Sequence, residues 1–503
     1  MKSSSDVFDA INSLERRFPV RAWRSGDIDL WPTYRIRLHG NAMDRILLND
    51  AVKLPALRLR EIATRISRAL CRVPYATLRD WRRNAPVRRG TTAVFLSDGI
   101  SFVQLGDTWF DRVIDPVMQA LEARDQHGLK LTPLSEVHIP RYMPSRFIQL
   151  AVDRIKVSAT YGRAEMETPE FEKVHKAARE FFDIAPSQSW LQIQAARLHA
   201  LAKWFGRVFE RSGATHAFVN TYYSLEGLAF VQAARRLGLL SVDLQHGIQG
   251  PHHVAYARWL SPPACGYSTL PDEFWVWGAE EASAIDAWRS SCTTHVPRIS
   301  GNFWLQRWRD ESDPLVARYL KQARGLRGSQ PQALVCVAWG VPDEETVKLI
   351  EAAKLCGPSI AWWWRLHPVL ARQSGEFARR LERHGLDGSQ VRQATDLPLF
   401  ALLRAADLTL TYSSTVIREA AELGVPSVVT SDYGAEMHSG LVGRGVVLHA
   451  NDVSAIAAAT KSLAARKRSA SEPETVDRQS LQALVDTTFS APLPSARGQN
   501  APA

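Results

Sequence analysis

The sequence predicts an α/β protein with two Rossmann-like domains facing each other across a cleft. Three observations support this prediction. The chain has 503 residues, more than one ordinary core accommodates. Its second half alternates short apolar runs with helical stretches, and the runs are apolar throughout, as in the strands of a parallel sheet covered on both faces. A content of 45% apolar and 23% charged residues is typical of a globular protein.

A strand-helix-strand unit is visible in the first half of the chain. Apolar runs at residues 91–97, 216–224 and 239–245 predict strands, and residues 226–238 predict the helix between the last two. We therefore expect a Rossmann-like domain over residues 1–268.

A basic segment at residues 57–89 lies inside that domain. It contains ten arginines against Glu61 and Asp80, and its apolar residues share one helical face, which predicts a basic amphipathic helix. The helix either packs on its own domain with a solvated arginine face or docks on anionic lipid, in line with the net charge of +10. No RNP, zinc-finger or homeodomain-like pattern accompanies the charge, so nucleic acid is not an expected partner.

The second half of the chain gives the clearest pattern. Strands are expected at residues 333–339, 359–367, 407–412, 426–431 and 445–450. Helices are expected at residues 343–355, 377–385, 415–424 and 452–465. We assign a Rossmann-like domain to residues 269–467. Residues 468–503, rich in Ser, Pro and Ala, are expected to form a largely disordered tail.

The cellular location follows from what the sequence lacks. The five cysteines form no CxxC pair, which is typical of reduced thiols. Met1–Asp9 lacks the pattern of a signal peptide, and no apolar run approaches the length of about 20 residues that crosses a bilayer. We expect a cytoplasmic protein, peripheral at the inner face of the membrane if the basic segment docks there.

Ligands of open parallel sheets bind beyond the carboxyl ends of the strands, so the residues there are the candidates for a site. His367 follows one strand, and Pro368 fixes the exit of the chain, so that the imidazole can donate to a phosphate oxygen. Arg365 is a second candidate for phosphate binding.

A further strand is followed by Ser413 and Ser414, and a helix begins directly after them. The two hydroxyls and the free N–H groups of the helix predict an anion site, with a diphosphate or phosphodiester as its ligand. Glu419 lies further along the same helix, where its carboxylate could accept from ribose hydroxyls.

Several motifs together resemble the bacterial surface-polysaccharide glycosyltransferases of the GT-B fold, and more narrowly the capsule polysaccharide biosynthesis proteins. These motifs are LQHG…HHVAY (Leu244–Tyr256), PDEFWVWG (Pro271–Gly278), PRISGN (Pro297–Asn302), RLHP (Arg365–Pro368) and YSSTVIREAAELGVPSVV (Tyr412–Val429). The HP and SS pairs are also similar to those of bacterial sialyltransferases and Kdo transferases, where they hold the CMP part of a CMP-sugar.

The resemblance implies a glycosyltransferase that uses a nucleotide sugar, inverts the configuration at the anomeric carbon and needs neither metal nor cofactor. CMP- or CDP-linked donors are expected ahead of UDP- or GDP-linked ones, and the acceptor would be a lipid-linked glycan or a polysaccharide. Three alternatives stay open: a CDP-alditol phosphotransferase of the teichoic-acid type, a non-catalytic scaffold of a polysaccharide assembly complex, and a sugar-nucleotide epimerase.

A transferase of this kind needs a base for the acceptor hydroxyl. His246 follows the strand at 239–245 and leads, either as the base or as a donor to substrate, with a purely structural histidine as the alternative. Asp98 and Glu226, which follow earlier strands, are the other candidates. The acidic pattern at 27–29 is interpreted as a helix start rather than a metal site.

Overall fold

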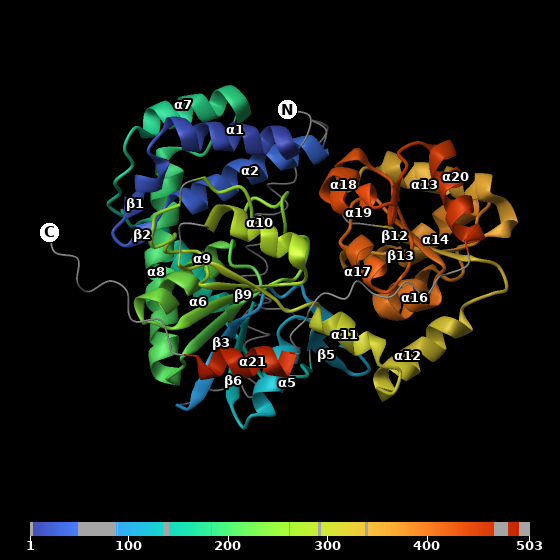
Figure 1. Ribbon diagram of the computed structural model, residues 1–503, viewed down its shortest axis with the longest axis horizontal. Helices are drawn as coiled ribbons and strands as arrows, with labels where there is room; N and C mark the ends of the chain where they lie inside the picture. Colours follow the sequence, from blue (N-terminus) through green and yellow to red (C-terminus); the bar gives the residue numbers. More distant parts are fainter. Residues whose placement is uncertain are drawn as a thin grey trace. The chain divides into compact units, whose positions relative to one another are not determined.

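The computed structural model in Figure 1 describes residues 4–48, 87, 89–133, 140–182, 184–260, 262–289, 293–337, 341–466 and 481–491. The chain forms two compact units, Met1–Phe303 together with Asp477–Ala503, and Trp304–Val476. Each unit contains its own parallel sheet, so the predicted α/β class with two Rossmann-like domains is confirmed. The predicted cleft between the domains stays a prediction.

The sheet of the first unit is parallel, with the strand order β11-β10-β9-β8-β3-β6-β7 among the described residues. The strands are β3 (Thr91–Leu96), β6 (His127–Thr132), β7 (Ser145–Phe147), β8 (His216–Val219), β9 (Leu240–Leu244), β10 (Glu273–Val276) and β11 (Val296–Ile299). The chain starts at the centre with β3, fills one side through β6 and β7, and returns to β8 to fill the other side. Strands β3, β8 and β9 lie where the sequence predicted strands.

Helices cover this sheet in Figure 1. They are α1 (Ser4–Arg17), α2 (Trp31–Leu48), α5 (Asp115–Glu122), α6 (Gln149–Thr160), α7 (Phe171–Phe182), α8 (Gln188–Ser212), α9 (Leu225–Arg236), α10 (Ala279–Arg289) and α21 (Leu481–Ser490). Two short antiparallel pairs, β1 (Arg24–Ser25) with β2 (Ile28–Asp29) and β4 (Phe102–Leu105) with β5 (Thr108–Asp111), complete the unit.

Local sequence explains where α8 begins and ends and where α9 begins. The hydroxyl of Ser187 caps α8 by accepting from the Trp190 N–H at 3.2 Å, and Gly213, with φ of 72°, ends the helix in the left-handed conformation. The hydroxyl of Ser224 caps α9 in the same way. On one face of the sheet, Phe218 and Trp275 pack in a buried cluster with α5 and α21.

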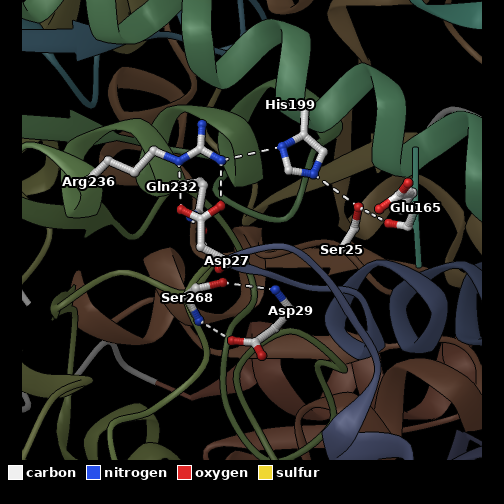
Figure 2. A network of polar contacts seen from close by, with 8 residues as sticks. All are labelled: Ser25, Asp27, Asp29, Glu165, His199, Gln232, Arg236 and Ser268. Atoms are coloured by element: carbon white, nitrogen blue, oxygen red, sulfur yellow. Dashed lines mark hydrogen bonds and ion pairs between the residues drawn. The ribbon is translucent and has the colours of Figure 1, made fainter. Parts of the chain in front are cut away.

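The acidic pair in the DID pattern anchors the β1–β2 hairpin (Figure 2). The Asp27 carboxylate accepts two hydrogen bonds from Arg236, at 2.6 and 2.7 Å, and one from Gln232 at 2.9 Å. Asp29 accepts from the backbone N–H of Ser268 at 2.6 Å and is buried. Both carboxylates therefore have protein partners, and α2 begins two residues after Asp29, close to the predicted helix start.

The second unit contains a parallel sheet with the strand order β13-β12-β14-β15-β16. Its strands are β12 (Gln332–Val337), β13 (Ala361–Leu366), β14 (Leu408–Thr411), β15 (Ser427–Val429) and β16 (Val447–His449). Its helices include α11 (Phe303–Arg309), α12 (Pro314–Gly325), α13 (Asp343–Cys356), α14 (Ser374–Arg383), α15 (Val391–Asp396), α16 (Leu399–Ala405), α17 (Val416–Glu422), α18 (Asp432–Met437), α19 (Ser439–Gly443) and α20 (Val453–Ala465), with the 3-10 turns η3 (Gly357–Ser359) and η4 (Pro368–Gln373). All five strands lie in the predicted runs.

The division between the units differs from the predicted boundary at 268/269. Strands β10 and β11 pair with β9, through a register that aligns Glu273 with Val242, and so extend the first sheet. The first unit therefore continues to Phe303. Apolar runs alone do not specify which of two parallel sheets a strand joins.

The predicted disordered tail also requires a correction. Residues 481–490 form helix α21, and Leu484 and Val485 are fully buried in the core of the first unit. Their apolar side chains pack on the sheet, which stabilises a helix too short to persist alone. The other tail residues, 468–480 and 492–503, lie outside the described residues.

Most of the basic segment, residues 57–86 and 88, also lies outside the described residues. The predicted amphipathic helix therefore stays a prediction. Among the helices that the structure describes, none combines the length and the hydropathy of a membrane span.

Candidate active site

The order in which the chain adds strands to the first sheet reverses between β3 and β8. Chain connections leave β3 toward β6 on one side and leave β8 toward β9 on the other, so the loops after these two strands diverge. Open α/β sheets bind ligands at such a switch point, beyond the carboxyl ends of the strands. Asp98 follows β3, Asn220 follows β8, and His246 follows the neighbouring strand β9.

The Asp98 loop is held to the end of β8. The backbone N–H of Asp98 donates to the Asn220 side-chain oxygen at 2.8 Å, and the Asn220 amide donates to the Ser101 hydroxyl at 3.2 Å. The Asp98 carboxylate accepts from the backbone N–H groups of Ile100 and Ser101, at 2.8 and 3.1 Å. The acid is therefore oriented by its own turn, and its side chain is half-buried.

His246 is half-buried at the end of β9, with its position set by the preceding residue. The Gln245 side chain accepts from the Trp277 N–H at 2.6 Å and donates to the Gly247 carbonyl at 2.9 Å, which fixes the exit from the strand. The Nε2 atom of His246 lies 3.3 Å from the Tyr223 hydroxyl. Its Nδ1 atom is covered and has no hydrogen-bond partner among the described residues.

Electrostatics keep the His246 imidazole neutral. Burial lowers the pKa of His246 below its ordinary value of 6.5, against the opposing effect of the Asp98 charge; Arg112 lowers it further and Asp111 opposes the shift. The ring therefore carries one proton at neutral pH, on either Nδ1 or Nε2. A neutral imidazole next to an aspartate can accept a proton or donate a hydrogen bond.

Glu226, the third candidate, is engaged in an ion pair. It lies in the first turn of α9, and its carboxylate contacts the Lys156 ammonium at 2.7 Å. The structure thus places His246 and Asp98 beyond the carboxyl ends of β9 and β3, with β8 between them, and gives Glu226 a partner of its own.

Two further histidines follow His246 in the sequence. His253 accepts the Ala255 N–H at Nδ1, at 3.2 Å, and burial lowers the pKa of His253 to about 3. No cluster of three or more His, Cys, Asp or Glu side chains suited to a metal ion occurs in the part of the chain that the structure describes. Independence from metals stays a prediction.

Sequence reasoning missed three residues at this edge. Asn220 directly follows β8, which ends at Val219, but the predicted run extended to residue 224 and so placed Asn220 inside the strand. Tyr223 lies in the same loop and carries no distinctive pattern. Asp243 is an acid inside an apolar strand, where burial raises the pKa of its carboxyl to about 7. A charged residue in a predicted buried strand is the signal that could have identified it.

In the second unit, strand register brings the predicted phosphate-binding residues to one edge. Cys336 of β12 aligns with Arg365 of β13 on one side and with Thr411 of β14 on the other. His367 and Ser413 each follow their aligned residue by two positions, so both lie just beyond the same carboxyl edge. One strand lies between theirs, which corresponds to about 10 Å.

His367 and Ser414 both make local backbone contacts. The Nδ1 atom of His367 accepts from the Val369 N–H at 3.3 Å. The Ser414 hydroxyl accepts from the Val416 N–H at 3.3 Å at the start of α17. Ser414 therefore makes a local contact just before Thr415, the N-cap residue of α17, and its hydroxyl hydrogen can still donate.

Glu419 occupies an interior position, and Arg365 is partly buried. The Arg365 guanidinium donates to three carbonyls at the end of α15, those of Ala394, Thr395 and Leu397. This arrangement stabilises the helix end and favours a structural role for the side chain. Glu419 is buried, with 3% of its surface exposed. Neither residue was expected to be covered in this way.

A hollow of about 270 Å³ lies beside this edge, at the ends of β12 and β13. It is lined by Val337, Val341, Asp343, Thr346, Leu366, Leu370, Gln373, Glu376, Phe377, Arg380 and Arg383. Its volume is at the lower limit for ligand pockets, so it would accommodate part of a nucleotide sugar rather than all of it.

No protein-family model matches this sequence, and no curated protein matches it. Among solved structures, the chain is similar to the UDP-GlcNAc 2-epimerase of Methanocaldococcus jannaschii in complex with UDP-GlcNAc and UDP, at 12% identity and a TM-score of 0.47, covering 79% of this chain and 99% of that chain.

Two further similar structures are transferases or polymerases by name. The spinosyn rhamnosyltransferase SpnG, complexed with thymidine diphosphate, has 14% identity and a TM-score of 0.41, covering 79% of this chain and 100% of that chain. A variant of the wall teichoic acid polymerase TagF has 11% identity and a TM-score of 0.43, covering 87% of this chain and 98% of that chain. Similarity at this level assigns no residue role, substrate or reaction to this chain.

Proposed function

We propose that this protein is a glycosyltransferase that moves a sugar from a nucleotide-sugar donor to a surface polysaccharide or lipid-linked glycan. The observation that carries the proposal is the neutral His246 imidazole at the end of β9, one strand from the switch point between β3 and β8, where the Asp98 charge acts on it. It has a nitrogen without a partner among the described residues, at the place where open α/β sheets bind ligands. The sequence resemblance to surface-polysaccharide glycosyltransferases supplies the substrate class.

The reaction needs two kinds of group. The acceptor hydroxyl must lose a proton, and the departing nucleotide phosphate must be stabilised as its negative charge develops. His246 and Asp98 are the groups proposed to act at the acceptor oxygen. His367, Ser413 and Ser414 are proposed to donate hydrogen bonds to the phosphates of a donor, with CMP- or CDP-linked sugars favoured. No metal ion or cofactor takes part in this proposal.

The donor site is tested by nucleotide binding. We expect His367→Ala and a combined Ser413→Ala, Ser414→Ala change each to weaken CMP or CDP binding by about 10-fold to 100-fold in calorimetry, because each removes hydrogen bonds to a charged group. His384→Ala is the matched control, since that histidine pairs with Glu351 in the same unit and takes no part in the proposed site. Wild-type affinity in both test variants would contradict the phosphate site.

The reaction itself is tested by incubating purified protein with nucleotide sugars and a lipid-linked acceptor. Transfer of the sugar alone supports the proposal, whereas phosphorus in the product would identify a phosphotransferase instead. Absence of both nucleotide binding and donor hydrolysis would favour the scaffold. His246→Ala should lower turnover by about 100-fold or more while donor affinity changes little.

We also propose that the protein works at the inner face of the cytoplasmic membrane, held there by the basic segment at 57–89. Each basic residue near an anionic leaflet contributes about 1 kcal/mol, so binding should weaken as salt rises. The measurement is co-sedimentation with anionic and neutral vesicles, comparing wild type with a variant carrying Arg65→Glu, Arg68→Glu and Arg72→Glu. Equal sedimentation of the two proteins on anionic vesicles would refute this anchor.

A further inference from the structure

The contact between Tyr223 and His246 specifies which nitrogen of the imidazole carries the proton. The Tyr223 hydroxyl lies 3.3 Å from Nε2, and the two rings are tilted by 31° with centroids 6.1 Å apart. Among the described residues this nitrogen is the hydrogen-bond partner recorded for the Tyr223 hydroxyl. A half-buried phenol donates its hydrogen wherever an acceptor is in reach, because an unmatched donor costs about 1–3 kcal/mol.

We infer that Tyr223 donates to Nε2 of His246 and thereby holds the ring in the tautomer protonated at Nδ1. An imidazole nitrogen that accepts a hydrogen bond must present its lone pair, so the single proton of the neutral ring lies on the other nitrogen. In the opposite tautomer Nε2–H would donate to the phenol oxygen, a weaker acceptor than the imidazole nitrogen, and the phenol hydrogen would lose this acceptor. Tyr223 is therefore a positioning residue for His246.

The surroundings keep both partners in the required state. Burial raises the pKa of Tyr223 well above its usual range, with the Asp243 and Asp98 charges adding to the effect, so the phenol stays protonated. The loop that carries Tyr223 is tied to β9, since the Tyr222 N–H donates to Asp243 at 3.3 Å. Gly227 allows this loop to pack closely, because a Cβ at that position would lie 2.3 Å from a loop carbonyl oxygen.

The tautomer determines what His246 can do, given the proposed function on which this step rests. The unmatched atom is Nδ1, and in this tautomer it is an N–H donor with no lone pair to accept a proton. Nδ1 is covered by protein atoms in this structure, so a ligand oxygen that accepts from it, either a phosphate oxygen or a sugar hydroxyl, must displace those atoms. Removal of the acceptor proton would be the task of another group, rather than of His246.

Nitrogen NMR of the intact protein tests the tautomer without any assay of activity. In protein labelled with ¹⁵N-histidine, at a pH where His246 is neutral, we expect Nδ1 to show the shift of a protonated nitrogen and Nε2 that of an unprotonated one. The signal is assigned by its loss in His246→Asn. Tyr223→Phe should move the ring toward the Nε2–H form. A wild-type ring already protonated at Nε2 would overturn the inference.

The identity of the ligand oxygen is tested by titrating the labelled protein. CDP serves as the phosphate probe and maltose as the neutral hydroxyl probe. A shift of the Nδ1–H signal with CDP alone indicates a phosphate oxygen, and a shift with maltose alone indicates a sugar hydroxyl. Either result supports a donor role. No shift with either probe, although CDP binds by calorimetry, would refute it, while absence of CDP binding would count against the proposed function instead.

Two substitutions separate a donor from a base in turnover. Asparagine places an amide nitrogen near the position of Nδ1, and glutamine places one near Nε2, yet neither can accept the acceptor's proton. We expect His246→Asn to retain about 10-fold to 100-fold more activity than His246→Gln. One hydrogen bond to an oxygen that carries or develops negative charge contributes a factor of about this size. Equal and complete loss in both folded variants would restore His246 as the base. Circular dichroism checks the fold of each variant.

Discussion

Replacing Asp243 with asparagine should remove a large part of the pH dependence of folding stability in the first unit. The carboxyl is fully buried in β9. It accepts from the Tyr256 hydroxyl at 2.9 Å, the Tyr222 N–H at 3.3 Å and the Gln249 amide at 3.4 Å. Since none of these donors is charged, burial dominates and raises the pKa of Asp243 to about 7.

The direction and size of the effect follow from this pKa. The folded state binds the proton more tightly than the unfolded chain, whose value is near the ordinary 3.8. The stability contributed by the neutral carboxyl is therefore complete at about pH 4 and is lost as the pH rises to about 7 and beyond. The folded and unfolded pKa values of Asp243 differ by about three units, and each unit corresponds to about 1.4 kcal/mol. The free energy of unfolding therefore falls by about 4 kcal/mol as the pH rises through this range.

The assay is urea denaturation of wild type and Asp243→Asn from pH 5 to 8, followed by tryptophan fluorescence. Asparagine cannot ionise and keeps an acceptor oxygen, so the variant should gain about 3 kcal/mol relative to wild type across this range. Other buried titrating groups are common to both proteins and cancel in the comparison. Asp387→Asn, at an exposed site, is the control. Parallel pH profiles for wild type and Asp243→Asn would refute the reasoning.

Three further substitutions test individual contacts. Gly227→Ala should lower the melting temperature, with a cost of about 1–3 kcal/mol, because the added Cβ would lie 2.3 Å from the Thr221 carbonyl oxygen; an unchanged melting curve would contradict this packing. Glu226→Gln removes a partly exposed ion pair with Lys156 and should change turnover by less than about fivefold. A loss of turnover of about 100-fold would instead mark Glu226 as the base. Arg365→Lys should lower the thermal stability of the second unit and leave CDP affinity unchanged. Weaker CDP binding with an unchanged melting temperature would instead indicate that Arg365 contacts the phosphate.

The strands of the second sheet could be predicted from the sequence because their signal is local. Each is a short apolar run followed by a helical stretch, and a strand buried on both faces needs such a run wherever it pairs. Polar residues at the ends of such runs in both units identified His246, Asp98, His367 and Ser413, since the carboxyl edge is where a strand gives way to a loop. The α/β class and the candidate strand ends therefore required no tertiary information.

The tertiary structure alone decided which elements and side chains meet. Strands β10 and β11 join the first sheet, and α21 packs beneath it, because pairing and burial with residues far away in the sequence stabilise them there. The Tyr223 contact with His246 spans 23 positions, and the Asn220 contact with Asp98 spans 122. Contacts of this kind depend on strand order and register, which are set by the packing free energy of the whole sheet rather than by any local pattern of residues.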